Sequence, residues 1–479
     1  LIEPRQNFLE KMSLLIASSL VNTEQEVTSK VRIFNPFERP IYLYQDTWIG
    51  TAEEVQGEIV QMALPKTEKH TILRQVSNED RNRDIPEHLL KMYNKARDGK
   101  SPEEKELIQL VLCKYANIFS KSDSDVGLTT LVKHTIDTGD TRPIKQPPRK
   151  VPMAFAEEEK NLIKQMEENG VIRKSSSPWA SPLCLVVKKN GKIRPCVDYR
   201  KLNSVTKQDA FPLPRVQDCL DAVAGSRYFS TFDLTSGYHQ VPMEESSIPK
   251  TAFATKYGLY EFLTMPFGLS CAPATFQRLM ELVLQGLQWE ICLIYLDDVV
   301  VYGSTVREHM ERVDKVFECL LRANLKLKPE KCQLLQEEVT FLGHVVNKHG
   351  ISPNPDNVNK LIRMKTPTNV REVRGILGLG SYYRRFISGF SQIVKPMVDL
   401  TRKDSKFKWT NECEQALNNL KKALIGADVM AYPRNKGTYI LDTDASDYAI
   451  GAVLSQEQEQ DGTRESYLLW KSHVGKIGE

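Results

Sequence analysis

The 479-residue sequence has no run of 18 apolar residues, which is the length that a membrane-spanning helix requires. It also has no Cys-x-x-Cys pair, since its nine cysteines are scattered singly. This spacing argues against zinc knuckles and disulfide scaffolds and predicts an intracellular, reducing setting, with cytoplasm and nucleus both open. The sequence starts at Leu1 without an initiator Met or a signal-peptide pattern, so we expect a piece of a longer product.

Net charge is also small, at +4, but it is unevenly distributed. Residues 356–408 hold 12 Lys or Arg against 4 Asp or Glu, together with several aromatic residues. Such a segment suits a nucleic-acid phosphate backbone. An ordinary solvated helical face is the alternative for any single lysine. Oligomeric state cannot be read from the sequence.

Two adjacent carboxylates interrupt the apolar stretch at residues 291–303. Asp297 and Asp298 stand between two runs of β-branched and aromatic residues, a pattern that predicts a buried β-hairpin. A third carboxylate, Asp233, ends another apolar strand at residues 228–233. Buried carboxylates are costly unless a cation neutralises them, so we expect the three to meet at one site.

Three carboxylates offer the hard oxygen ligands that Mg²⁺ or Mn²⁺ prefers. Two such ions about 4 Å apart activate an attacking hydroxyl and stabilise a leaving oxygen in phosphoryl transfer. The plainer alternative is an Asp-rich surface turn, which the apolar flanks of Asp297 and Asp298 disfavour.

Before this site the sequence predicts several local structures. Strand-like pieces occur at residues 31–34 and 41–44. Ser101, followed by Pro and by Glu104, predicts a capped helix start. Asp137-Thr138-Gly139 contains the Asp-Thr-Gly of aspartic proteases, but Asp140 and Thr141 follow in place of a small apolar residue, so we interpret it as a connector.

An amphipathic helix ending at Gly170 and a basic hairpin come next. The hairpin is predicted by Asn190-Gly191 between strand-like runs. Its tip carries Lys188, Lys189 and Lys192, and it is interpreted either as a soluble turn or as a mobile finger that covers a triphosphate. Residues 341–344 predict a short strand containing a Gly.

Taken together, these motifs resemble the reverse transcriptase of gypsy-type LTR retrotransposon Pol polyproteins. The resemblance covers roughly residues 130–455 and is collinear. Its marks are residues 192–203, 232–240, 265–269, 295–298, 341–344 and 377–386. It implies an α+β fold: a right-hand polymerase of fingers, palm and thumb, with a connection and a truncated RNase H-like α/β domain.

The family pattern also implies the domain boundaries. Residues 1–65 would be a β-rich segment between protease and polymerase, and residues 66–150 a linker with helices. Fingers and palm would occupy 151–335, and primer grip, thumb and connection 336–430. Residues 431–479 would be the truncated RNase H-like start, with Asp444 as a vestigial metal ligand. We expect no RNase H activity from it, because that chemistry needs about four carboxylates on a complete sheet.

Residue by residue, the resemblance assigns both metal binding and catalysis to Asp233, Asp297 and Asp298. Lys189 and Arg194 would contact the incoming triphosphate, with Lys188 as an alternative to Lys189.

Further roles surround the nucleotide and the primer. Tyr238 would be a steric gate whose ring fills the space of a ribose 2′-hydroxyl, so that dNTPs are preferred. Phe267 and Gly268 would line the nucleotide pocket. The implied primer grip consists of Phe341, Leu342, Gly343 and His344. Lys331 is a candidate general acid.

The sequence thus predicts an RNA-directed, and DNA-directed, DNA polymerase that uses template, primer, dNTPs and two Mg²⁺ ions, with Mn²⁺ as a substitute. The alternative is a catalytically silent or domesticated retroelement fragment that only binds nucleic acid. A nuclease is the least favoured hypothesis, because only Asp444 of its carboxylates can be placed.

Overall fold

The structure is a computed structural model that divides the chain into two units, Leu1–His70 and Thr71–Glu479. It describes residues 84–187, 193–387, 389–403, 405–426, 438–446, 449–457 and 464–473, together with four short strands in the first unit. These strands are β1 (Ile2–Pro4), β2 (Leu15–Ile16), β3 (Ile33–Phe34) and β4 (Gly50–Ala52). β1 pairs with β4 and β2 with β3, both antiparallel. Strand β3 matches part of the strand expected at 31–34, while residues 41–44 lie outside the described residues.

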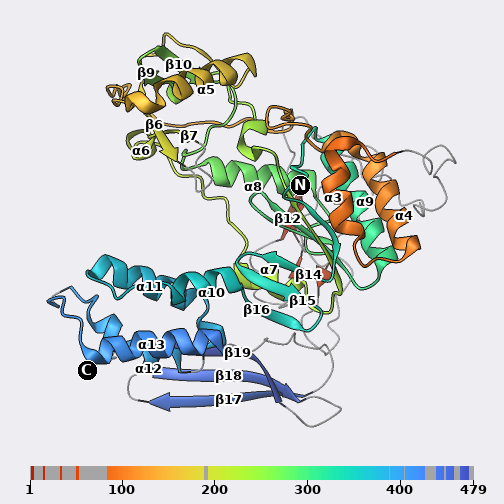
Figure 1. Ribbon diagram of the computed structural model, residues 1–479, viewed down its shortest axis with the longest axis vertical. Coiled ribbons are helices and arrows are strands. Elements are labelled where there is room, and N and C mark those ends of the chain that lie inside the picture. Colours follow the sequence, from red (N-terminus) through yellow and green to blue (C-terminus); the bar gives the residue numbers. More distant parts are fainter. Residues whose placement is uncertain are drawn as a thin grey trace. The chain divides into compact units, whose positions relative to one another are not determined.

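The second unit contains a four-stranded antiparallel sheet in the order β11-β12-β8-β13. Its strands are β8 (Tyr228–Asp233), β11 (Cys292–Tyr295), β12 (Asp298–Gly303) and β13 (Gln333–Gln336). Helix α8 (Ala272–Val283) packs against β11, and α9 (Val306–Arg322) packs against β8 and β12 (Figure 1). The hairpin expected around Asp297 and Asp298 is thus confirmed.

A five-stranded sheet has the order β5-β10-β9-β6-β7, with three of its strands before β8 in the chain and two after it. The bounds are β5 (Ile172–Lys174), β6 (Ser181–Val187), β7 (Ile193–Val197), β9 (Phe253–Thr255) and β10 (Gly258–Phe262). β6 and β7 form an antiparallel pair in which Val187 stands opposite Ile193. The connection between them, residues 188–192, lies outside the described residues, so the predicted basic tip stays a prediction.

The helices before and between these sheets are α3 (Leu90–Arg97), α4 (Pro102–Lys114), α5 (Ala156–Glu168), α6 (Arg200–Asn203) and α7 (Val216–Ala222). Two of them, α4 and α5, were predicted from the sequence. The capping box is formed as expected, with Ser101 and Glu104 bonded reciprocally. Gly170, at φ +68°, follows the end of α5. Single-turn 3₁₀ helices lie at Glu87–Leu89, Ala116–Ile118, Met153–Phe155, Gly237–Gln240, Ile248–Thr251 and Arg384–Phe386.

The C-terminal part of the second unit combines a three-stranded sheet with four helices and a further three-stranded sheet. The first sheet is β14 (Glu338–Phe341), β15 (His344–Asn347) and β16 (Gly350–Pro353). The helices are α10 (Pro355–Ile362), α11 (Val370–Tyr382), α12 (Phe390–Asp399) and α13 (Asn411–Ile425). The last strands are β17 (Tyr439–Ser446), β18 (Ala449–Glu457) and β19 (Arg464–His473).

One local expectation was wrong. Residues 341–344 do not form a short strand but the tip of the β14–β15 hairpin, in which Phe341 stands opposite His344. Leu342 and Gly343 have φ of +45° and +70°, and two consecutive positive φ values are what a tight two-residue hairpin turn requires. Leucine rarely adopts this conformation, so the turn was not visible in the sequence.

The four-stranded sheet is buried on both faces, and this explains its continuous apolar runs. Side chains alternate along a strand, so Val299 and Val301 enter one hydrophobic core while Val300 enters another. The first core holds Phe232 and α9; the second includes buried residues from β14, α11 and α13. Among the described residues, no helix is long and apolar enough to cross a bilayer.

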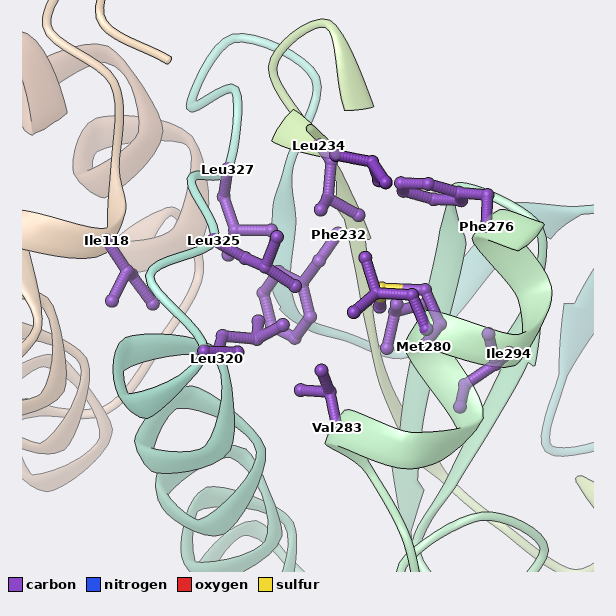
Figure 2. Close-up of a cluster of buried hydrophobic side chains, with 14 of the residues drawn as sticks. Ile118, Phe232, Leu234, Phe276, Met280, Val283, Ile294, Leu320, Leu325 and Leu327 are labelled. Carbon is purple, nitrogen blue, oxygen red and sulfur yellow. The ribbon is translucent and has the colours of Figure 1, made fainter. Parts of the chain in front are cut away.

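Phe317, fully buried on α9, is the centre of the first core. Its ring meets the rings of Phe232, Tyr115 and Phe119 at centroid distances of 4.8, 5.5 and 5.6 Å, each edge-on. Figure 2 shows part of this core: Phe232 of β8 and Leu234, which follows the strand, lie among side chains of α8 and α9. Aromatic packing of Phe232 against Phe317 of α9 therefore fixes the strand that carries Asp233.

Replacing Phe317 by Ala should lower the free energy of unfolding by about 3–5 kcal/mol, because a large aromatic core contact is replaced by a cavity. Leu321→Ala, on the exposed side of the same helix at 46% exposure, should cost less than about 1 kcal/mol. Urea unfolding followed by circular dichroism measures both variants. Equal costs for the two variants would contradict the assigned core.

Candidate active site

The sheet register brings the three predicted aspartates to one end of neighbouring strands. Asp298 is the first residue of β12 and pairs directly with Asp233, the last residue of β8. Asp297 belongs to the two-residue turn between Tyr295 and Asp298. Residues opposite each other on antiparallel strands have side chains on the same face, so Asp233 and Asp298 share one face.

Gln277 supports the turn from α8, although the sequence reasoning did not single it out. Its side chain is fully buried, and its Oε1 accepts the Leu296 N–H at 2.8 Å. Its Nε2 lies 3.4 Å from the Ile294 carbonyl oxygen and donates to Glu281 at 2.8 Å. Leu296 has φ +56°, a strained value for leucine, and the bond from Gln277 satisfies its backbone at that point. No local pattern in the sequence indicated this contact, which joins residues 19 positions apart.

Negative charge at this site is partly compensated by Lys331. Its Nζ contacts both Asp233 oxygens, at 2.9 and 2.8 Å. The Asp298 side chain is exposed at the surface, yet the protein around it partly desolvates its carboxyl group. This desolvation and the charges of Asp297 and Asp233 raise the pKa of Asp298 to about 6, while the charge of Lys331 opposes the shift. Three neighbouring carboxylates beside one lysine leave net negative charge at this end of the strands, which a bound cation would offset.

The residues fit a divalent-metal site in chemical kind, since all three offer carboxylate oxygens. Within the described part of the chain, however, no three His, Cys, Asp or Glu side chains are gathered closely enough to hold an ion as they stand. Asp233 already binds one cation, the Lys331 ammonium, at the position where a metal ligand is expected. Metal binding at these aspartates would therefore require side-chain rearrangement around Asp233.

Aromatic rings line the next part of the site. Tyr238 stacks on Phe267 with ring centroids 5.0 Å apart and planes 26° apart, and it also meets Phe276 of α8 at 5.4 Å. Burial, with a smaller effect from the charge of Asp297, raises the pKa of Tyr238, so its hydroxyl stays protonated at neutral pH. Gly268 follows Phe267 with φ +97°, a conformation that favours glycine. The structure thus brings together Tyr238, Phe267 and Gly268, as expected.

A cleft of about 580 Å³ joins these features. Its lining includes Asp233, Asp297, Lys331, Phe267 and Gly237. The wall thus offers both charged groups and aromatic rings, which suits a ligand with phosphates and a base.

The predicted primer-grip residues form a separate, braced hairpin tip. The Tyr382 hydroxyl donates to the Leu342 carbonyl oxygen at 2.5 Å, and the Tyr383 hydroxyl donates to that of Gly343 at 2.6 Å. Burial lowers the pKa of His344 to about 4, so its ring is neutral at pH 7, and its Nδ1 donates to the same Leu342 carbonyl at 2.8 Å. Two tyrosines from the end of α11 thus hold the strained turn.

Four sequence-predicted residues are not placed by side chain. Lys188 and Lys189 lie outside the described residues. Arg194 and Asp444 are described only as backbone, Arg194 on β7 opposite Val186 and Asp444 on β17 opposite Gly451. Their assigned roles stay predictions.

Comparison with protein families gives two matches. Residues 186–346 match "Reverse transcriptase (RNA-dependent DNA polymerase)". Residues 409–472 match "RNase H-like domain found in reverse transcriptase". The first match covers the four-stranded sheet with all three aspartates and the strands β7, β9 and β10 of the five-stranded sheet. The second covers α13, β17, β18 and nearly all of β19.

Curated relatives and solved structures agree with these matches. The chain is 40% identical over 366 residues to the retrovirus-related Pol polyprotein from transposon 297 of Drosophila melanogaster, covering 75% of the chain and 34% of that protein. It is 35% identical over 357 residues to the corresponding polyprotein from transposon gypsy of the same fly, covering 71% and 34%. The chain thus spans about a third of the length of these relatives.

Among solved structures, the chain is similar to the foamy viral protease-reverse transcriptase in complex with dsDNA. The TM-score is 0.73 at 26% identity, with 82% of each chain covered. The complex of the same viral protein with an RNA/DNA hybrid gives 0.71 at 25% identity, covering 81% of this chain and 52% of that one. The shared motifs, the two domain matches and the shared fold lead to one conclusion: the chain belongs to the reverse transcriptase family of retrotransposon Pol polyproteins.

Proposed function

We propose that this chain is an RNA-directed and DNA-directed DNA polymerase that extends a primer with dNTPs by two-metal phosphoryl transfer. The observation that carries the proposal is the register that sets Asp298 opposite Asp233, with Asp297 in the adjoining turn. These aspartates lie beside a cleft that is lined by Phe267. Relatives of known structure bind dsDNA or an RNA/DNA hybrid, which supports nucleic acid as the partner.

In this proposal Asp233, Asp297 and Asp298 hold two Mg²⁺ ions, or Mn²⁺ in their place. When bound, the ions supply activation of the primer 3′-hydroxyl and charge neutralisation at the pyrophosphate. The chain itself supplies fixed carboxylates on a rigid sheet and a lysine, Lys331, in contact with one of them. The ammonium of Lys331 is also a candidate proton donor to the leaving group, within the same cleft.

The nucleotide would lie between the aspartates and the Tyr238–Phe267 pair. The Tyr238 ring would exclude a 2′-hydroxyl, which favours dNTPs over rNTPs. Arg194 and Lys189, at the β6–β7 hairpin, would contact the triphosphate. Residues 341–344 would hold the primer terminus, with fingers and palm at 151–335 and the primer grip, thumb and connection at 336–430.

The proposal predicts metal-dependent incorporation of dTTP on poly(rA)/oligo(dT) by the purified chain. Asp297→Asn should lower the rate at least about 100-fold, because a charged group that acts in the transition state is lost. Chelation of divalent ions by EDTA should stop synthesis in the unaltered chain. Incorporation is measured with labelled dTTP in Mg²⁺ and in Mn²⁺.

Primer-template binding by fluorescence anisotropy is the control, and it should persist in Asp297→Asn. If the unaltered chain folds and binds primer-template but synthesises nothing, the alternative is supported: a silent fragment that only binds nucleic acid. Equal synthesis by Asp297→Asn would contradict the assigned metal site.

A second prediction concerns the hairpin tip. Tyr382→Phe removes only the hydroxyl that donates to Leu342, so primer-terminus affinity should fall about fivefold, the equivalent of one hydrogen bond of about 1 kcal/mol. Tyr257→Phe is a matched control, because Tyr257 is similarly exposed and its hydroxyl donates to the Ala156 carbonyl on α5. KM for the primer-template should rise in Tyr382→Phe and stay unchanged in Tyr257→Phe. An unchanged KM in both variants would contradict a role of the hairpin tip in primer binding.

A further inference from the structure

The loop that carries Phe267 and Gly268 is held by the side chain of Asn203. Asn203 is the last residue of α6. Its Nδ2 donates to the Gly268 carbonyl oxygen at 2.8 Å, and its Oδ1 accepts the Ser270 N–H at 3.0 Å. One amide side chain thus pairs with the backbone at two points of the loop, as a neighbouring strand would.

The loop needs such support because of its backbone. Residues 265–270 belong to no helix or strand, and Gly268 has φ +97°. A Cβ on Gly268 would lie 3.4 Å from the Val197 carbonyl oxygen and 3.6 Å from Tyr199 Cδ2, so the loop passes close above the end of β7. Tyr199 is itself fixed, since its buried hydroxyl donates to the Thr251 carbonyl at 2.8 Å. Asn203 therefore fixes the position of the loop relative to the end of β7 and Tyr199.

The position of this loop determines one of the aromatic neighbours of Tyr238. Phe276 is a buried residue of α8 and cannot shift without moving the helix. Phe267 stacks on Tyr238 from the loop, one residue before the carbonyl that Asn203 binds. Movement of Gly268 would carry Phe267 with it and change the support of the Tyr238 ring.

We propose that Asn203 is a positioning residue for sugar selection: by bonding Gly268 and Ser270 it holds Phe267 against Tyr238 and so sharpens the discrimination between deoxyribonucleotides and ribonucleotides. This inference rests on the polymerase function proposed above. Asn203 acts through Phe267 and Tyr238. A purely structural role would lower stability or overall rate, but it would leave the ratio between the two sugars unchanged.

Two substitutions of nearly equal size separate the hydrogen bonds. Asn203→Asp keeps an oxygen for the Ser270 N–H but loses the donor to Gly268 and sets a carboxylate oxygen against that carbonyl. Asn203→Leu removes both bonds. The ratio of kcat/KM for dTTP to that for UTP, measured on poly(rA)/oligo(dT) with the full chain, should fall about five- to tenfold in Asn203→Asp, as expected for one hydrogen bond. In Asn203→Leu it should fall by at least as much.

The route through Tyr238 is tested by a double variant. Tyr238→Ala alone should lower the dTTP-to-UTP ratio further than either Asn203 variant. Adding Asn203→Asp to Tyr238→Ala should then produce no further loss, because residues that act through one group are not additive. An independent, multiplicative loss would overturn the proposed route.

Asn347→Asp is the control, since Asn347 also bonds the backbone of a turn, the one between β15 and β16, while its Nδ2 donates to Glu338 at 3.0 Å. Its Oδ1 accepts from His349 N–H at 2.9 Å and from Gly350 N–H at 3.2 Å. This variant should keep the ratio of the unaltered chain. Asn203 variants with unchanged thermal midpoint, unchanged primer-template binding and an unchanged dTTP-to-UTP ratio would overturn the inference.

The two proposals fail in different ways. If the unaltered chain incorporates neither nucleotide, the polymerase function fails and the inference fails with it; if it incorporates dTTP with an Asn203-independent ratio, only the inference fails. Should both Asn203 variants unfold, Phe267→Leu removes the stacked ring without touching Asn203. An unchanged ratio in that variant would also overturn the inference.

Discussion

The concentration of negative charge at one end of the β8–β12 pair is the constraint on which the rest of this site depends. Two unit charges 4 Å apart interact by about 4 kcal/mol in surroundings of effective dielectric constant 20. Asp233 and Asp298 face each other in the register with Asp297 adjacent. Desolvation, and after it the charges of Asp297 and Asp233, raise the pKa of Asp298 to about 6. The chain offsets part of this repulsion with Lys331, and the sheet beneath has to hold the carboxylates together.

That sheet is rigid because both of its faces are buried. Phe232, one residue before Asp233, packs edge-on against Phe317, while alternate residues of β12 enter the two cores. The turn itself needs a specific contact as well, since Leu296 in a left-handed conformation costs roughly 1–2 kcal/mol. Gln277 offsets this by accepting the Leu296 N–H from inside the core. Packing therefore fixes the strands, and one buried amide fixes the turn.

The sequence was sufficient for features whose signals are local. Apolar runs predicted the hairpin at Asp297 and the strand before Asp233. Ser101 with Glu104 predicted the N-terminal cap of α4. Each of these signals depends on residues only a few positions apart. The contacts of Lys331, Gln277 and Asn203 join segments 98, 19 and 65 positions apart, which no local pattern reports. The tip at Leu342 was missed because leucine is rare at positive φ. The hydroxyls that bond this tip come from tyrosines 40 positions away.

Lys331 links the electrostatics to the chemistry. Its ammonium contacts both oxygens of Asp233, so a divalent ion at Asp233 would either share this carboxylate with the ammonium or displace it. The backbone that carries the lysine is anchored beside Asp233, because the Lys328 N–H donates to the Asp233 carbonyl at 2.8 Å and the Lys331 N–H to the Lys328 carbonyl at 3.0 Å. In the proposed reaction the ammonium therefore stays beside the site, where the phosphates bring new negative charge. Lys331 thus neutralises Asp233 in the absence of substrate, and in the proposed reaction it supplies a positive charge when substrate binds.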